Sequence, residues 1–240
     1  MHEKNSRPFS VIIPLSPEEQ AWKNLCSLLL CLPEDCEVIF VRPTKLTKQE
    51  KGYLHLLQKK MQVNWLISGL GRAIQMNHGA KHAQCDVLWF LHADSFFSPN
   101  LIARLSDNLQ DLNQKIYFFK LGFQNSSRER SYRLIDLNAW GANFRSRKLQ
   151  MPFGDQGLCM AKELFMGLGM FDENCLIGED NKFIWLAKKR GVSLKEIDAT
   201  IYTSQRKYQE KGWLRTSVSH LYYTVKQGAP YYFDKIMKKL

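Results

Sequence analysis

The chain has 240 residues, of which 45% are hydrophobic and 24% are charged, so it can fold around a sizeable core and is neither a disordered nor a fibrous sequence. Lys and Arg outnumber Asp and Glu by 34 to 23, which gives a net charge of +11. This excess favours an anionic partner, such as a phosphorylated small molecule, an anionic membrane or a nucleic acid, without selecting one of them.

The first half of the chain alternates short apolar runs with segments of helical periodicity. Strands are predicted at residues 9–14, 36–41, 63–67 and 87–91. Helices are predicted after each of them, and two begin at capping boxes, Ser16-Pro-Glu-Glu19 and Thr47-Lys-Gln-Glu50. The third helix follows a glycine turn at Gly69 and Gly71, and the fourth begins at Ser98-Pro-Asn100. Four such units predict an α/β fold with a mostly parallel, doubly wound sheet and helices on both faces.

The second half is less regular. Strands are predicted at 116–123, 157–161 and 192–197, and helices at 132–144 and 180–190, the last one ended by Gly191. No low-complexity linker or internal repeat interrupts the chain. We therefore predict a single domain over residues 1–240, with its core at 9–200 and a basic, aromatic, helical C-terminal segment at 201–240.

Sheets of this class bind ligands at the carboxyl edge of their strands, so the residues that follow each strand are candidates for a site. Gly69-Leu-Gly-Arg72 begins a helix, where free backbone N–H groups suit a phosphate, although an ordinary tight turn would look the same. Asp94, in His92-Ala-Asp94, follows a strand directly. Its carboxylate can hold a divalent cation against a diphosphate, or it can simply cap a turn.

Two further acidic segments lie in the second half. Gly154-Asp155-Gln156-Gly157 places a carboxylate between glycines, and Gly178-Glu179-Asp180 places two at a predicted helix start. Acidic residues at a helix N-terminus are favourable in themselves, by about 0.3–1 kcal/mol, so Glu179 and Asp180 can be there for the helix dipole alone. Their combination with an aspartate after a strand and a phosphate-ready helix start favours a catalytic site.

These segments, taken together and in order, resemble the family 2 glycosyltransferases of the GT-A fold, and are most similar to short bacterial members described as selenodomain-associated transferases. The matching pieces are Val11-Ile-Ile-Pro14 with Glu18-Glu19, Arg72 to Ala80, Asp86 to Asp94, Phe153 to Gly157, Gly169-Met-Phe-Asp172 with Glu179-Asp180, and Thr203 to Tyr208 with Lys211-Gly212. The resemblance covers about Phe9 to Arg215. It implies a nucleotide-diphospho-sugar transferase fold with a C-terminal helical extension.

The resemblance also implies roles for single residues. Asp94 would hold a divalent metal, Mn²⁺ or Mg²⁺, that bridges the diphosphate of a nucleoside-diphosphate sugar, and Asp180 would be the general base of an inverting transfer to an acceptor hydroxyl. Glu179 and Asp155 complete the catalytic group, and Asp155 lines the acceptor side with Gln156. The residues expected to contact the donor are Pro14, Glu18, Arg72, Asn77, His92, Ala93, Gln156 and Arg206.

One departure from the family pattern favours a second hypothesis. The family usually has an acidic residue after its second strand, where the nucleotide base binds, whereas Val41-Arg-Pro-Thr-Lys45 has none. Either another residue reads the base, or nucleotide binding has changed or been lost. The alternative function is therefore a non-catalytic binding or scaffold module that has kept the GT-A fold and lost the donor chemistry.

The C-terminal segment carries much of the positive charge. Residues 201–240 hold eight Lys or Arg and two acids, beside many aromatic and aliphatic residues. This composition suits a helix that lies in an anionic membrane interface, and it equally suits a helix packed on the core with a basic outer face. The first alternative would place the acceptor on a lipid or a membrane. The basic residues are dispersed and form no nucleic-acid motif, so nucleic acid is not an expected partner.

The expected compartment is the cytoplasm, with peripheral contact to the inner membrane face as a further expectation. No pair among the six cysteines has the spacing of a zinc knuckle or redox motif, so we predict buried thiols. Residues 1–8 have no apolar run of the kind that a secretory signal needs, and the apolar stretch at 25–32 is too short to span a bilayer.

Overall fold

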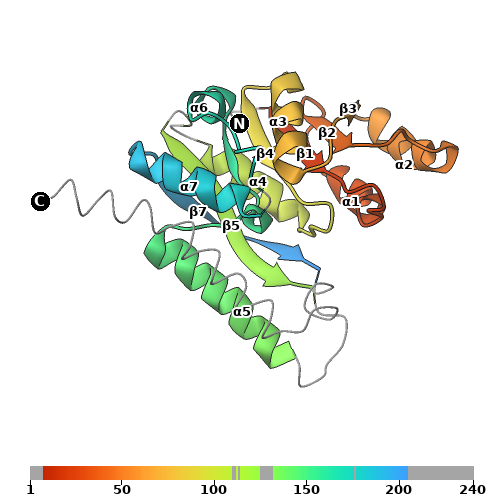
Figure 1. Cartoon of the computed structure of the whole chain (residues 1–240). Coiled ribbons are helices and arrows are strands. Elements are labelled where there is room, and N and C mark those ends of the chain that lie inside the picture. Colours follow the sequence, from red (N-terminus) through yellow and green to blue (C-terminus); the bar gives the residue numbers. More distant parts are fainter. Residues whose placement is uncertain (1–7, 110–111, 113, 125–131, 176, 205–240) are drawn as a thin grey trace, which may run out of the picture.

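The fold is a seven-stranded sheet with helices on both faces, as predicted (Figure 1). The computed structural model describes residues 8–109, 112, 114–124, 132–175 and 177–204. In the order in which they lie side by side, the strands are β3 (Gln62–Ile67), β2 (Glu37–Arg42), β1 (Ser10–Pro14), β4 (Val87–Phe90), β6 (Cys159–Ala161), β5 (Lys115–Phe123) and β7 (Ser193–Thr203). Strands β3, β2, β1 and β4 are parallel, and β5 and β7 are parallel to each other. The short β6 pairs antiparallel with both β4 and β5 and joins the two halves.

Helices follow the strands as the alternating pattern predicts. They are α1 (Trp22–Leu29), α2 (Lys48–Gln58), α3 (Arg72–His82), α4 (Pro99–Asn108), α5 (Tyr132–Phe144), α6 (Lys162–Gly167) and α7 (Glu179–Lys189). A π-helical turn, η1 (Arg145–Leu149), continues α5, and a single 3₁₀ turn, η2 (Gly154–Gln156), precedes β6. Among the described residues, no helix combines the length and the apolarity that crossing a membrane requires.

The core consists of two apolar layers, one on each face of the sheet. Neighbouring residues of β1 point to opposite faces, so Val11 packs in the layer under α1, α2 and α4, while Ile12 packs in the layer under α3, α6 and α7. A third, small cluster lies between the far end of β5, at Leu121 and Phe123, and the alanines of α5. All six cysteines belong to the described part of the chain, and all are free thiols.

The first predicted capping box is wrong, and the second is confirmed. Helix α1 begins only at Trp22, and in the turn before it the Glu19 carboxylate accepts hydrogen bonds from the backbone N–H groups of Gln20 and Ala21. In α2, Thr47 and Glu50 exchange both bonds of the capping box. The glycine turn before α3 is confirmed, with Gly71 at a φ of 126°.

Candidate active site

The loop that follows β4 reaches the carboxyl edge of the sheet beside the end of β1. The Leu91 N–H donates to the Ile12 carbonyl at 3.0 Å, and the chain then turns through His92, Ala93 and Asp94. His92 and Asp94 are half-buried, whereas Ala93 is buried. This placement agrees with the prediction that the residues after β4 face the ligand edge.

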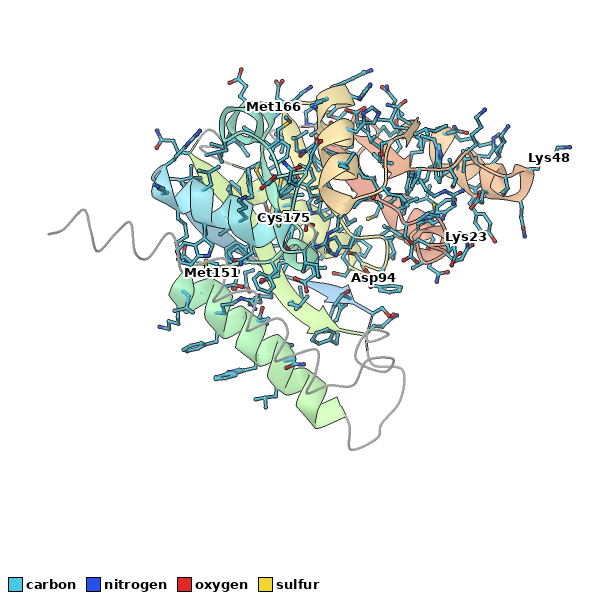
Figure 2. All side chains as sticks on the ribbon, viewed as in Figure 1. Lys23, Lys48, Asp94, Met151, Met166 and Cys175 are labelled. Carbon is cyan, nitrogen blue, oxygen red and sulfur yellow. The ribbon has the colours of Figure 1, made fainter. Side chains whose placement is uncertain are left out.

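Asp94 lies against the end of β7, as its label in Figure 2 shows. Its Oδ2 atom accepts a hydrogen bond from the Thr203 hydroxyl at 3.3 Å. Just beyond Asp94, Phe96 and Tyr202 exchange two backbone hydrogen bonds at 2.7 and 2.8 Å, which attach the loop to β7. The carboxylate is therefore positioned by a strand more than a hundred residues away in the chain.

Two segments that are distant in the sequence, around Gly154 and Asp180, converge beside this loop. The Gly154 N–H donates to Asp180 Oδ2 at 2.5 Å, and the Asn181 N–H donates to Asp180 Oδ1 at 2.8 Å. A Cβ atom built on Gly154 would lie 3.0 Å from Asp180 Oδ2 and 3.2 Å from His92 Nε2. The Asp180 carboxylate and the His92 imidazole thus meet over a residue without a side chain, and two backbone donors fix the direction of the carboxylate.

Glu179 faces the start of α3. Its carboxylate is buried and forms an ion pair with Nε of Arg72, the first residue of α3, whose side chain is 36% exposed. The negative charges of Asp180 and Glu179 outweigh the desolvation of the Arg72 guanidinium and raise its pKa above the ordinary value, and Asp155 acts in the same direction. Arg72 is therefore a fixed positive charge that holds these acidic segments at the phosphate-ready end of α3.

Gln156 supports the loop that carries Gly154 and Asp155. Its buried side chain donates to the Phe119 carbonyl at 3.0 Å, and its Oε1 accepts from the Phe153 N–H at 3.1 Å. The Ser146 hydroxyl of the π-helical turn lies 2.6 Å from the same Oε1 atom. These contacts explain the buried amide as a brace between the loop and β5, and a contact of Gln156 with the donor stays a prediction.

Gly157 ends this loop in a conformation that a larger residue cannot adopt without strain. Its φ is 64°, and a Cβ atom there would lie 2.5 Å from Ile201 Cδ1 and 2.9 Å from Trp89 Nε1. We expect Gly157→Ala to lower the free energy of unfolding by about 2–4 kcal/mol, because left-handed backbone strain and overpacking add. Urea unfolding monitored by circular dichroism measures the change.

Gly191 is the matched control for this substitution. It has a φ of 78°, but a Cβ atom there would meet nothing within 4 Å. Gly191→Ala therefore reports the backbone strain alone, about 1–2 kcal/mol. Equal losses of stability in the two variants would show that the close packing around Gly157 contributes nothing.

The other predicted donor residues occupy different surroundings. Asn77 is buried, and its amide exchanges hydrogen bonds with the backbone of Phe171 at 2.8 and 3.1 Å and donates to the Glu173 carboxylate at 2.9 Å, so it holds the loop before α7. Pro14 is the buried last residue of β1, and Glu18 is exposed in the turn before α1. Arg206 lies outside the described residues, as does most of the predicted C-terminal segment.

The second strand ends in a buried ion pair at the place where the family pattern has an acid. Arg42 Nη1 and Nη2 donate to the two carboxylate oxygens of Glu50 at 2.8 and 3.0 Å, and the guanidinium lies 4.9 Å from the Trp65 ring centroid. Both charged side chains are at most 5% exposed. Helix α2 thus brings an acid to this strand end, and Arg42 neutralises it.

The residues around Asp94 fit a shared metal site. In the described ranges no group of three or more His, Cys, Asp or Glu side chains could hold an ion by itself. Mg²⁺ and Mn²⁺ prefer oxygen ligands, and they are commonly held by one or two carboxylates together with substrate phosphates and waters. Asp94 supplies one such carboxylate, and a diphosphate would supply further oxygen ligands.

Several residues that build this site are not evident from the sequence. Gly154 acts through its backbone N–H, Ser146 through a π-helical turn, and Thr203 through the last position of a strand that ends six residues later than predicted. The glycines that flank Asp155 were the one available signal, since a glycine permits the close approach of another chain segment. No local pattern marks Ser146, and Thr203 was noted only as the first residue of a segment that resembles the family.

The structure is similar to solved glycosyltransferases. Residues 1–349 of TarS from S. aureus, solved with UDP, match with a TM-score of 0.63 and 16% identity over 82% of this chain and 60% of that one. GalNAc-T7, solved with UDP, GalNAc and Mn²⁺, matches with a TM-score of 0.60 and 15% identity over 85% of this chain and 45% of that one. The mannosyltransferase PcManGT from Pyrobaculum calidifontis, in complex with GDP-Man and Mn²⁺, matches with a TM-score of 0.59 and 13% identity over 82% of this chain and 57% of that one.

These similarities show a shared GT-A fold, and this chain spans three fifths or less of the length of the three structures just described. No curated protein matches it. The model of the family described as "Glycosyl transferase family 2" matches residues 10–166, which include β1 to β6, the His92–Asp94 turn and the Gly154–Gly157 loop. The chain belongs to glycosyl transferase family 2.

Proposed function

We propose that the protein is a metal-assisted, inverting glycosyltransferase of the hexosyltransferase type, which transfers a sugar from a nucleoside-diphosphate sugar to an acceptor hydroxyl. The observation that carries this proposal is the convergence of Asp180, His92 and the Gly154 backbone at the carboxyl edge of the sheet. The membership of the chain in glycosyl transferase family 2 supports the transfer of a sugar. Similar structures that hold UDP, UDP-GlcNAc or GDP-Man support a nucleotide-sugar donor.

In this proposal Asp180 is the general base. Its carboxylate, fixed by the N–H groups of Gly154 and Asn181, removes the proton from the acceptor hydroxyl as the oxygen attacks the anomeric carbon. Attack comes from the face opposite the bond to the diphosphate, so the anomeric configuration inverts. A divalent ion, held by Asp94, would neutralise the departing diphosphate when bound. The Arg72–Glu179 pair keeps the start of α7 in place.

The alternative, a non-catalytic GT-A-like module, is favoured by the strand end at Arg42. The only acid that the described structure brings there, Glu50, is consumed by an internal ion pair and by the helix cap. If recognition of the nucleotide base needs a free carboxylate at this strand end, the protein has lost donor binding. Metal-dependent nucleotide binding distinguishes the two functions, because only the enzyme needs to bind a nucleotide together with a metal.

Calorimetric titration with UDP and GDP, in the presence and absence of Mn²⁺, tests the proposal. We expect binding that depends on Mn²⁺, and Asp94→Asn should weaken it by at least about tenfold because the ion loses its protein carboxylate. Asp86→Asn is the control, since Asp86 is exposed at the opposite end of β4. Absence of Mn²⁺-dependent binding in the unmodified protein would favour the scaffold module.

The remaining features of the proposal concern context. We propose a single domain over residues 1–240, a cytoplasmic location and an acceptor that is lipid-linked or membrane-borne, and the similarity to selenodomain-associated transferases stays a prediction. Membrane contact through residues 201–240 rests on their composition alone, because residues 205–240 lie outside the described residues.

A further inference from the structure

Over residues 137–144, the part of helix α5 whose side chains the structure describes, the large apolar side chains lie on the outside. Its inner side packs on β5 through two small residues, Ala139 and Ala142, which contact the cluster at Leu121 and Phe123. Asn143 fastens this inner side, because its amide exchanges hydrogen bonds of 2.8 and 3.0 Å with the backbone of Leu121. A surface helix normally buries its largest apolar residues against the core, so this arrangement is the reverse of the usual one.

The outer side carries the larger residues. Leu137, Trp140 and Phe144 are 51%, 63% and 48% exposed, and they follow each other at intervals of three and four residues, so they form one stripe. The rings of Trp140 and Phe144 stack at a centroid distance of 5.5 Å. Leu149, at the end of the π-helical turn, extends the stripe and is 51% exposed. In Figure 2 the side chains on this side of α5 project away from the molecule.

Basic groups border the end of this stripe. Arg147 and Lys148 are exposed on the π-helical turn next to Leu149, and the Lys188 ammonium donates to the Leu149 carbonyl at 2.7 Å. Arg147 also forms an ion pair with Glu196 of β7. An aromatic and aliphatic stripe bordered by Lys and Arg is the composition of helices that lie in the interface of an anionic bilayer.

We propose that this outer face of α5, formed by Leu137, Trp140, Phe144 and Leu149, docks on an anionic phospholipid bilayer. Trp140 and Phe144 enter the headgroup region, where aromatic rings are favoured, and the exposed Lys148 meets lipid phosphates. The chain has a net charge of +11, so a second copy of it, or its own basic C-terminal segment, would repel the basic border of the stripe. An anionic surface would attract this border and is therefore the better partner.

This surface is connected to the candidate active site. The π-helical turn that ends in Leu149 also contains Ser146, whose hydroxyl lies 2.6 Å from Gln156 in the Gly154–Gly157 loop. Docking of α5 would therefore place that loop, on the acceptor side of the proposed site, close to the bilayer. The docking itself does not rest on the proposed transfer reaction and is tested without it.

The test is cosedimentation of the full chain with vesicles of phosphatidylcholine alone and of phosphatidylcholine mixed with an equal part of phosphatidylglycerol. We expect binding to the mixed vesicles, weakened by salt, and little binding to the neutral ones. Replacing Leu137, Trp140 and Phe144 together by Ser should lower the apparent affinity at least about tenfold, because their apolar area no longer leaves water on docking.

Two controls make the test decisive. Leu56→Ser on α2 removes an apolar side chain outside the stripe that is 60% exposed, against 63% for Trp140, and it should leave vesicle binding unchanged. The triple variant should keep the melting temperature of the unmodified protein, since the stripe faces water in the absence of lipid. Unchanged vesicle binding in the triple variant would overturn the proposal. A lower melting temperature would mean that the protein itself covers the stripe, and a smaller molecular mass in solution would identify a second copy as the partner.

Discussion

Asp180→Asn is expected to lower kcat for sugar transfer by about 10²–10⁴-fold, the usual contribution of a general base. The substitution keeps the size of the side chain but removes its ability to take the proton of the acceptor hydroxyl. Donor affinity should stay close to that of the unmodified protein, because the proposed metal and diphosphate contacts come from Asp94 and the start of α3. Single-turnover assays with the donor, together with calorimetry, measure the two effects separately.

The control for this substitution is Asp172→Asn. Asp172 lies in the loop before α7, is partly exposed, and forms an ion pair with Lys182, which follows Asp180 by two residues in α7, so Asp172→Asn removes an equal charge from the same region of the fold. We expect kcat to stay unchanged in this variant. Because an amide in place of the Asp180 carboxylate can accept only one of its two backbone hydrogen bonds, the melting temperatures should also be compared. Normal turnover by a folded Asp180→Asn protein would exclude Asp180 as the base.

Glu50→Gln should lower the free energy of unfolding by about 3–5 kcal/mol, because it leaves the Arg42 guanidinium buried without a compensating charge. The substitution also weakens the capping box of α2, in which Glu50 accepts from the Thr47 N–H at 2.8 Å. Replacing Arg42 by Met in the same protein should restore much of the stability, since no buried charge then remains unpaired. Urea unfolding of the two single variants and the double variant measures the coupling.

The same ion pair gives a pH dependence with a definite sign. Hydrogen bonds from Arg42 outweigh the desolvation of Glu50 and lower its pKa from 4.5 to about 2. The unfolded chain therefore binds a proton at a higher pH than the folded chain does, and the stabilisation, about 3 kcal/mol, is complete above pH 5 and lost as the pH falls to 2. The slope of stability against pH should be shallower in Glu50→Gln between these values. Equal slopes would show that the pair does not contribute.

Local patterns predicted what local interactions control. The capping box at Thr47 and Glu50 formed as expected because its two hydrogen bonds join residues three apart. The equally good pattern at Ser16 and Glu19 failed, since Trp22 is fully buried against Phe40 and Trp65, and the start of α1 follows that packing. The antiparallel direction of β6 was also beyond the sequence, because a three-residue strand has no pattern that distinguishes the two directions.

The sequence by itself determined the alternation of strands and helices, and it selected the sheet edge where a site is expected and Asp94, Asp155, Glu179 and Asp180 as candidates for its chemistry. Periodicity and residue type carry this information, since both act over a few residues. Only the tertiary structure decided that His92, Gly154 and Asp180 come together, that Arg42 is neutralised by Glu50, and that α5 turns Trp140 and Phe144 outward. These are contacts between segments far apart in the chain, and sheet order and packing, rather than any local pattern, bring such segments together.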